Sequence, residues 1–180
     1  MKIEVNEKVH LSPIREDDKR AFVEYLNDEE TSKRLLYPPF PYLAKHADEF
    51  VAKVAAKTER EGQPVVWAIR DVDDRLIGAC GFDDLEIGKS HRAEIGYWLA
   101  RPFWGQGIMP AVVTKLCEHA FEHLEVVKVV AHIFVFNDQA GRVLEKCGFV
   151  AEGYLYAHYK KDGRFHDSKA FGLVKPGVVS

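Results

Sequence analysis

Two glycines in the segment Trp104-Gly105-Gln106-Gly107-Ile108-Met109 lie between a predicted strand and a predicted helix. Glycine adopts left-handed backbone angles and lets a ligand approach the main chain closely. The first amides of a helix lack partners within the helix, and with the helix dipole they favour an anion. The segment therefore predicts a main-chain phosphate site. From two glycines alone, a tight turn whose glycines only satisfy steric needs is an equally good interpretation.

Two other phosphate motifs do not fit this segment. A P-loop requires Gly-Lys-Ser/Thr, whereas Gly107 is followed by Ile108 and Met109. A dinucleotide fingerprint requires a third glycine, and Pro110 stands in its place. Neither kind of nucleotide site is predicted.

Glu94 is a carboxylate on the predicted strand that precedes the glycine turn. Because side chains alternate along a strand, Glu94 shares one face with Gly96 and Trp98. A carboxylate beside a ligand site is a candidate general base. The alternative interpretation is a partly exposed or salt-bridged strand glutamate.

Cysteines and histidines do not predict a metal site. The three cysteines, Cys80, Cys117 and Cys147, are odd in number and lack Cys-x-x-Cys spacing, which disfavours both a disulfide framework and zinc. His119 and His123 are four residues apart on a predicted helix, but the glutamate of a zinc motif is missing. We interpret the two histidines as part of an exposed helical face and expect no metal.

The elements that position these residues form one alternating α/β series. The stripe Ala47, Phe50, Val51, Val54 and Ala55 predicts the inner face of a helix that ends at Gly62. In chain order we expect a strand over 9–14, a helix from 17 or 18 to about 28, a loop over 35–41, that second helix, strands over 64–69, 76–82 and 93–99, a helix from Pro110 to 124, a strand over 126–135, a helix over 140–147, and two antiparallel strands over 149–156 and 165–174.

The length of 180 residues and the hydrophobic content of 47% allow one substantial core, so we expect a single domain over residues 1–180. No apolar stretch approaches the roughly 20 residues of a membrane helix, and the N-terminus lacks an apolar signal core. We therefore expect a soluble, cytoplasmic protein without a membrane partner. Acids and bases are interspersed and the net charge is -3, so no nucleic-acid partner is expected.

Three ordered motifs resemble the Rim-type (RimJ/RimL-like) branch of the GNAT superfamily of N-acetyltransferases. They are the strand Glu94-Ile95-Gly96-Tyr97-Trp98-Leu99, the turn Trp104–Met109, and Asn137 followed by Leu144-Glu145-Lys146-Cys147-Gly148-Phe149. The predicted element order agrees with this fold from Val9 to Val174. The resemblance implies an α/β enzyme whose mixed, mostly antiparallel, twisted sheet of six to seven strands has helices on both faces.

The resemblance also implies a cofactor, acetyl-CoA, whose pyrophosphate is bound by the amides of Gly105 to Met109. A splay between the Glu94 strand and the strand over 126–135 would admit pantetheine, and Asn137 would hydrogen-bond the pantetheine arm or nearby backbone. Arg101, Lys115, Arg142 and Lys146 are candidates for pairing with the adenosine 3′-phosphate, with Arg142 and Lys146 preferred. The expected cofactor-binding residues are Trp98, Leu99, Arg101, Trp104, Gly105, Gln106, Gly107, Ile108, Met109, Asn137, Arg142 and Lys146.

Two departures from the family pattern stand out. Trp104 and Met109 fill the outer positions of a turn that is usually Arg/Gln-x-x-Gly-x-Gly/Ala, and because the contacts use main-chain amides we expect the site to survive both changes. Ala140 stands where relatives usually have serine, which removes one side-chain contact near the cofactor.

Acetyl transfer requires a neutral amine. With reference pKa values of about 7.7 to 8 for an α-amine and about 10.4 for lysine, a general base is expected, and Glu94 is the candidate. A leaving thiolate needs a proton donor such as a tyrosine hydroxyl. The sequence does not choose among Tyr154, Tyr156 and Tyr159, and Tyr154 is the candidate carried forward.

The acceptor is expected to enter over the loop 35–41, where Tyr37, Phe40 and Tyr42 either line an entrance or cover the core. The acidic run Asp28, Glu29 and Glu30 either attracts a cationic amine or is solvated surface. Within the resemblance, the leading acceptor is a protein or peptide N-terminal α-amine of the ribosomal-protein kind. A small amine (polyamine or aminoglycoside) and a catalytically weak acyl-CoA-binding module are the alternatives, and the protein is expected to be a monomer or homodimer.

Overall fold

The computed structural model describes residues 1–178 and groups the chain into two units, each made of more than one stretch. Unit 1 contains Met1–Gly81 and Tyr97–Ala111, and unit 2 contains Phe82–Gly96 and the chain from Val112 onward. Three elements run from one unit into the other, namely β4 (Leu76–Asp83), β5 (Arg92–Leu99) and α4 (Ile108–His123). The glycine turn between β5 and α4 therefore belongs to unit 1, whereas Glu94 belongs to unit 2.

Unit 1 is built on strands that pair antiparallel in the order β1 (Ile3–Glu4), β2 (His10–Pro13), β3 (Val66–Arg70) and β4. The end of β5 is tied to β4, because the amide of Ala100 donates to the Ile77 carbonyl at 2.8 Å. Gly78 permits this approach, since a Cβ there would collide with the Trp98 carbonyl oxygen. The chain therefore enters the glycine turn from a fixed position on β4.

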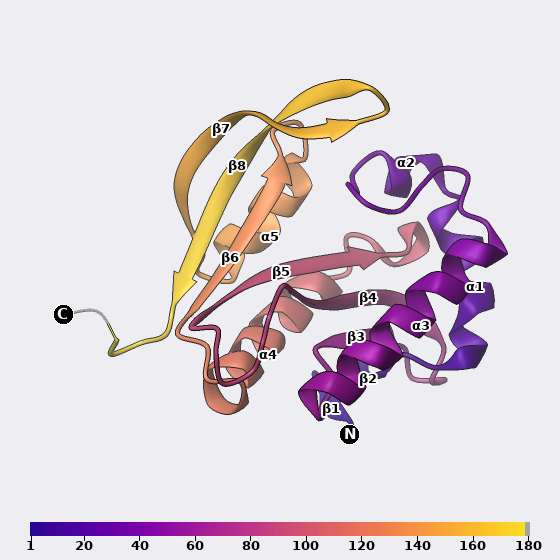
Figure 1. The fold of residues 1–180 in the computed structure, drawn as a ribbon, viewed down its shortest axis with the longest axis horizontal. Helices are drawn as coiled ribbons and strands as arrows, with labels where there is room; N and C mark the ends of the chain where they lie inside the picture. The colour runs from indigo at the N-terminus through magenta and orange to yellow at the C-terminus, as the bar shows by residue number, and fades with distance from the viewer. Residues whose placement is uncertain (179–180) are drawn as a thin grey trace. The chain divides into compact units, whose positions relative to one another are not determined.

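The helices of unit 1 are η1 (Glu16–Asp18), α1 (Lys19–Leu26), α2 (Glu29–Ser32) and α3 (Ala44–Glu61). Helices α1 and α3 pack together (Figure 1), with the Phe22 ring 5.1 Å from the Phe50 ring. The core cluster of this unit is Phe22, Leu26, Tyr42, Ala47, Ala68, Leu76 and Ala79. Helix α3 ends at Gly62 (φ 71°), as predicted, but Ala55, predicted to face inward, is exposed because the apolar stripe ends at Val54.

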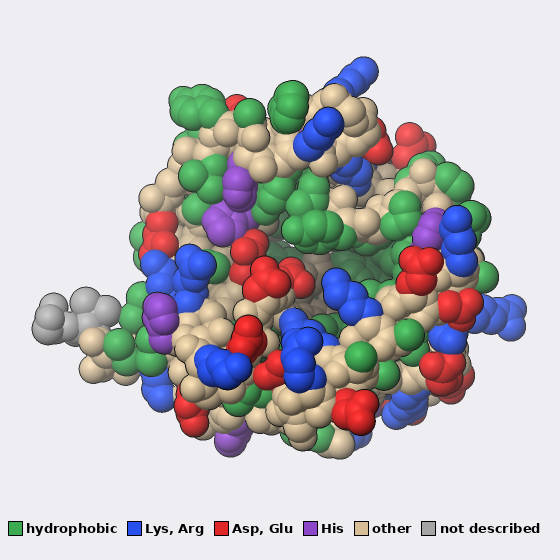
Figure 2. Space-filling view, in the orientation of Figure 1, with side chains coloured by type: hydrophobic (Ala, Val, Ile, Leu, Met, Phe, Trp, Pro, Cys, Tyr) green, Lys and Arg blue, Asp and Glu red, His purple; other side chains and the backbone are tan. Residues whose placement is uncertain are grey.

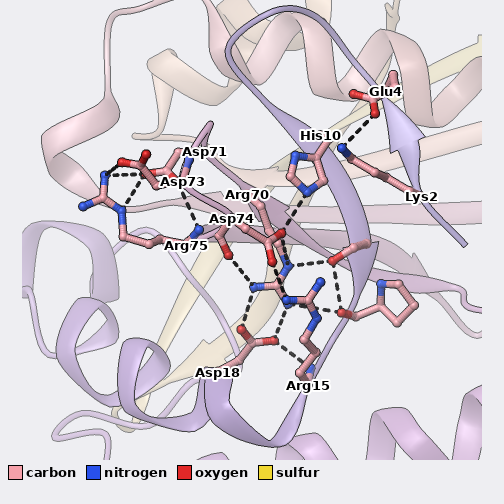
Figure 3. Close-up of polar contacts among 12 residues, drawn as sticks. Lys2, Glu4, His10, Arg15, Asp18, Arg70, Asp71, Asp73, Asp74 and Arg75 are labelled. Carbon is pink, nitrogen blue, oxygen red and sulfur yellow. Dashed lines mark hydrogen bonds and ion pairs between the residues drawn. The ribbon is translucent and has the colours of Figure 1, made fainter.

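A buried ion pair joins the start of α1 to β3 (Figure 3). The Arg70 and Asp18 side chains are 2% and 4% exposed, and two hydrogen bonds of 2.8 Å link the guanidinium to the carboxylate. Arg70 also donates to the Ser12 hydroxyl at 2.6 Å. Both buried charges are thus satisfied, as burial in an apolar surrounding requires.

Unit 2 is built on the start of β5, which runs parallel to β6 (Lys128–Phe134), and on two antiparallel pairs, β6 with β8 (Arg164–Val174) and β8 with β7 (Val150–Lys161). Strands β7 and β8 are joined by Asp162 and Gly163, both at positive φ (50° and 74°), as a two-residue hairpin with a type I′ turn requires. A register shift occurs between Leu155 and Tyr159, and inside it the amide of Ala157 donates to Asp167 at 2.7 Å.

Helices α4 and α5 (Asp138–Lys146) bury their apolar faces in unit 2, with Val113, Leu116 and Leu144 inaccessible to solvent. The prediction that His119 lies on an exposed helical face is wrong. Its side chain is buried, because it falls on the same side of α4 as Leu116 and Ala120. Burial lowers the pKa of His119. His123 is exposed, as expected.

The predicted fold class is confirmed as α/β with a mixed, mostly antiparallel sheet, although residues 1–178 form eight strands rather than six or seven. Strand β1 and helix α2 are elements that the sequence pattern did not predict. Helix α4 begins at Ile108, two residues before Pro110, because all first-turn positions lack an intrahelical amide partner and tolerate proline. Within residues 1–178, no helix has both the length and the apolar composition to span a bilayer.

Candidate active site

The glycine turn is exposed and its main chain is accessible. Gly105 and Gly107 have φ angles of 73° and 74°, and a Cβ added to either would meet no heavy atom within 4 Å. In the described residues, no amide of Gly105, Gln106 or Gly107 donates a hydrogen bond to the protein. Helix α4 starts directly afterwards and directs the positive end of its dipole at the turn. An anion can therefore reach unpaired amides here.

Side chains on both sides of the turn hold its shape. The Trp104 indole N–H donates to the Leu99 carbonyl at 2.6 Å, and the Arg34 guanidinium lies 5.1 Å from the centre of the Trp104 ring. The Gln106 amide donates to the Pro102 carbonyl at 3.1 Å. Ile108 and Met109 are buried beneath the turn. The Trp104 side chain thus holds the outer position of the turn against the end of β5.

A pocket of about 360 Å³ lies beside the turn in unit 1, lined by Asn6, Glu7, Lys8, Gln106 and Ile108. The Asn6 side-chain oxygen accepts the amides of Lys8 and Val9, at 2.9 and 3.1 Å, and so fixes the local turn. Gln106 and Ile108 are among the predicted cofactor-binding residues, but the sequence did not predict Asn6, Glu7 or Lys8, because nothing local to them indicates that they lie beside the glycine turn.

Arg101 is engaged by the protein. Its guanidinium is 3.2 Å from Asp28, whose other oxygen caps α2 by accepting the Thr31 amide at 2.9 Å. Lys115 pairs with Glu118 at 3.2 Å. Arg142 and Lys146, by contrast, are exposed on α5 and form no ion pair within residues 1–178. The preference for Arg142 and Lys146 as partners of a phosphate stays a prediction.

Glu94 lies at the point where the parallel ladder of β5 and β6 ends. The paired residues are Arg92 with Lys128, Ala93 with Val129 and Glu94 with Val130, and both strands continue beyond the last pair. The Glu94 carboxylate is 2.9 Å from Nδ1 of His132, which follows the paired residue Val130 by two positions on β6. Glu94 lies on a strand, as predicted, and it is partly exposed and paired, as the alternative interpretation expected, but the sequence did not identify His132 as its partner.

Asn137 is the N-cap of α5, and its side-chain oxygen accepts the amide of Ala140 at 3.2 Å. This bond is one of the two roles expected for Asn137, a bond to nearby backbone. Ala140 contributes its main-chain amide to the cap, so the cap bond does not require a hydroxyl at this position.

Tyr154, the candidate proton donor, lies on β7 and donates its hydroxyl proton to Asp167 at 2.8 Å. This hydrogen bond raises the pKa of Tyr154, and hydrogen bonds from the Ala157 amide and from Tyr154 lower the pKa of Asp167. A phenol whose proton is shared with a carboxylate is a weaker acid. The geometry therefore does not favour Tyr154 as the donor to a leaving group.

The loop after α2 is irregular, as predicted, and exposes two aromatic side chains, Tyr37 (80%) and Phe40 (54%). Tyr42 instead belongs to the core cluster of unit 1, where burial raises its pKa to about 12. Tyr42 therefore covers the core, which is one of the two roles considered for these aromatics. Tyr37 and Phe40 face solvent, and a role at the entrance stays a prediction for them.

The described residues 8–150 match the family model of the acetyltransferase (GNAT) domain. The chain belongs to the GNAT acetyltransferase family. It is an N-acetyltransferase, and its cofactor is acetyl-CoA. This membership favours an enzyme over a module that only binds acyl-CoA.

Curated relatives of this chain are N-acetyltransferases, and the names of two of the three described here indicate an acceptor. An uncharacterized N-acetyltransferase, p20, of Bacillus licheniformis is 29% identical over 94% of both chains. The ribosomal-protein-serine acetyltransferase of Escherichia coli is 37% identical over 46% of each chain. Spermidine N(1)-acetyltransferase of Vibrio cholerae is 31% identical, covering 61% of this chain and 62% of that enzyme.

Solved structures share the fold. RimL, a ribosomal L7/L12 α-N-protein acetyltransferase in complex with coenzyme A, has a TM-score of 0.85 at 22% identity, covering 97% of this chain and 98% of RimL. Spermidine N-acetyltransferase from Vibrio cholerae, in complex with CoA and spermine, has a TM-score of 0.77 at 23% identity, covering 94% and 96%.

The residues of the turn fit the phosphates of acetyl-CoA on their own chemistry. Unpaired amides at two left-handed glycines are hydrogen-bond donors to an anion, and the open space around both glycines admits one. The turn itself contains no carboxylate to repel it.

Proposed function

We propose that this enzyme acetylates the N-terminal α-amine of a protein or peptide. The proposal rests on one observation above all, the exposed glycine turn with unpaired amides at the start of α4, which suits the cofactor of the family. The resemblance to the Rim-type branch supports the α-amine as acceptor, as does similarity to a ribosomal-protein-serine acetyltransferase.

In this proposal the amides of Gly105, Gln106 and Gly107 bind the pyrophosphate, and Arg142 and Lys146 pair with the adenosine 3′-phosphate. The cofactor supplies a thioester whose acetyl carbon is attacked by the amine. The Glu94 site provides the general base, which makes the attacking amine neutral at the moment of transfer. Tyr37 and Phe40 offer apolar surface to residues that follow the acceptor amine.

A polyamine is the second candidate acceptor, because spermidine N(1)-acetyltransferase is among the relatives. The acidic run at the start of α2 gives it little support. Asp28 is paired with Arg101, and Glu30 is paired with Lys33 and Arg34, so two of the three carboxylates are already neutralised by the protein. A free α-amine carries one positive charge and needs no such acidic cluster.

The test is the release of CoA from acetyl-CoA with a panel of acceptors. The panel contains peptides with a free N-terminal serine or alanine, the same peptides already acetylated at the N-terminus but carrying an internal lysine, spermidine and an aminoglycoside. We expect kcat/KM for the free peptides to exceed that for spermidine by about tenfold or more, with the acetyl group located on the α-amine by mass spectrometry. Faster turnover of spermidine or the aminoglycoside would contradict the proposed acceptor.

A further inference from the structure

The bond between Glu94 and His132 bridges two strands just past the end of their ladder. Glu94 is the last residue of β5 paired with β6, and its partner in the register is Val130. His132, two residues later, lies on the same face of β6 as Val130 because side chains alternate along a strand. The carboxylate therefore reaches forward to an imidazole that stands beyond the last paired residues.

Two contacts fix the orientation of the His132 ring. Nδ1 is 2.9 Å from the Glu94 carboxylate, and the ring of His158 meets the His132 ring edge-on at a centroid distance of 5.1 Å. His158 is itself anchored, because its Nδ1 lies 2.7 Å from the hydroxyl of the buried Ser168. Figure 2 shows histidine side chains gathered over β6 and β8, next to acidic side chains.

The ring presents an available base. A carboxylate beside Nδ1 selects the tautomer with a proton on Nδ1, which leaves the lone pair of Nε2 free. Within residues 1–178, His132 makes no hydrogen bond besides the one to Glu94, and the titratable side chains in contact with it are Glu94 and His158. The side chains of His132 and Glu94 are 20% and 40% exposed, so solvent reaches both.

We propose that Nε2 of His132 takes the proton from the acceptor amine and that Glu94 is the positioning residue that orients the imidazole. This inference rests on the proposed function and deepens it. An imidazole, with a reference pKa of about 6.5, is a better base near neutral pH than a carboxylate with one of about 4.3.

The step balances. The acceptor ammonium first gives one proton to Nε2 of His132, and Glu94 stabilises the resulting imidazolium. The neutral nitrogen then forms a bond to the acetyl carbon while the bond from that carbon to sulfur breaks. The second proton that nitrogen loses goes to the leaving thiolate, and the imidazolium releases its proton to solvent, so that free CoA and an acetylated amine are the products and His132 returns to its neutral form.

His132→Asn is the decisive variant, because the asparagine amide can still donate to Glu94 in place of Nδ1 but offers no base in place of Nε2. With the best acceptor of the panel, we expect kcat to fall by about 100-fold or more at pH 7. We expect the Kd for acetyl-CoA, measured by calorimetry, to stay within twofold. The loss should shrink as pH rises towards 9, because the acceptor then arrives deprotonated.

Glu94→Gln should cost less than His132→Asn, about tenfold in kcat, and the double variant should be no slower than His132→Asn alone, since Glu94 acts through His132. His123→Asn is the matched control. It removes another histidine beside a glutamate, with His123 3.6 Å from Glu122, but on the exposed side of α4, and it should leave kcat unchanged.

A His132→Asn enzyme with kcat within threefold of wild type, or a larger loss for Glu94→Gln than for His132→Asn, would overturn the assignment to His132 and leave the proposed function intact. If His132→Asn does not fold, as judged by its circular dichroism and unfolding temperature, His132→Gln gives the same comparison. A wild-type chain that binds acetyl-CoA but turns over no acceptor of the panel would overturn the proposed function, and the role of His132 with it.

Discussion

Gly107 and Gly163 have the same backbone φ of 74°, and at both a Cβ would enter open space. Gly107 belongs to the turn before α4, whereas Gly163 belongs to the turn of the β7–β8 hairpin. An alanine at either position pays for the left-handed conformation with about 1–2 kcal/mol. The pair therefore separates backbone strain from the loss of a binding surface.

Gly107→Ala is expected to raise the Kd for acetyl-CoA by about tenfold or more, because the methyl group enters the space where the phosphates approach the amides. Gly163→Ala should lower the unfolding temperature about as much as Gly107→Ala does, but it should leave the Kd for acetyl-CoA unchanged. Calorimetric titration of both variants measures the difference. Equal Kd values for the two variants would argue against phosphate binding at this turn.

Residues whose role is local could be predicted from the sequence, and residues whose role depends on a distant partner could not. The turn at Gly105 and Gly107 could be predicted because turn glycines are recognisable within a few positions, whereas Asn137 was named only through the family resemblance and its role as the cap of α5 comes from the structure. His132 and Lys8 were missed because their significance comes from strand register and from packing across the chain. For the same reason the partner that occupies Tyr154, Asp167, was not foreseen.

Helices and strands with a strong local sequence pattern could likewise be predicted, and those without one could not. Strands with β-branched runs and helices with an apolar stripe were placed to within a few residues, as β3, α3 and α5 illustrate. Strand β1 has two residues, and α2 is a single polar turn that depends on the Asp28 cap, so neither has enough periodicity to be recognised. The attachment of α1 to β3 through Arg70 and Asp18 is likewise invisible in either segment alone.

Arg70→Met is expected to lower the free energy of unfolding by about 3–5 kcal/mol, because it leaves the Asp18 carboxylate buried without its countercharge. Arg75→Met is the control. Arg75 also pairs with an aspartate, Asp71, at 2.8 Å, but its side chain is 68% exposed, and the loss should be below about 1 kcal/mol.

Denaturant unfolding measures both variants, and the double variant Asp18→Leu/Arg70→Met should recover most of the stability. If Arg70→Met cost no more than Arg75→Met, the buried pair would not be what holds α1 to β3.

At the scale of the whole molecule, both units contain separate stretches of chain, and β4, β5 and α4 are shared between them. Neither unit can be cut out of the sequence as one segment. A shared strand or helix cannot unfold in one unit without disturbing its continuation in the other. A single domain over residues 1–180 therefore stays a prediction, and the unfolding of the two units can test it.

The two units are therefore expected to unfold in one cooperative transition. All three tryptophans, Trp67, Trp98 and Trp104, belong to unit 1, so tryptophan fluorescence reports on that unit alone. Hydrogen exchange of β6 and β8 reports on unit 2. Midpoints that coincide for the two probes in denaturant are expected, and separate midpoints would show two domains that unfold independently.

Two contacts join the segment that precedes Tyr37 and Phe40 to the glycine turn and the residues just before it. Asp28 forms an ion pair with Arg101, and the Arg34 guanidinium lies over the Trp104 ring. Replacing this segment with that of a relative, in order to change acceptor preference, would also remove these two contacts. Such a chimera would differ in its binding of acetyl-CoA, the acetyl donor, as well as in its preference among acceptors. Grafts that begin after Arg34 and retain Asp28 would let the two preferences be engineered one at a time.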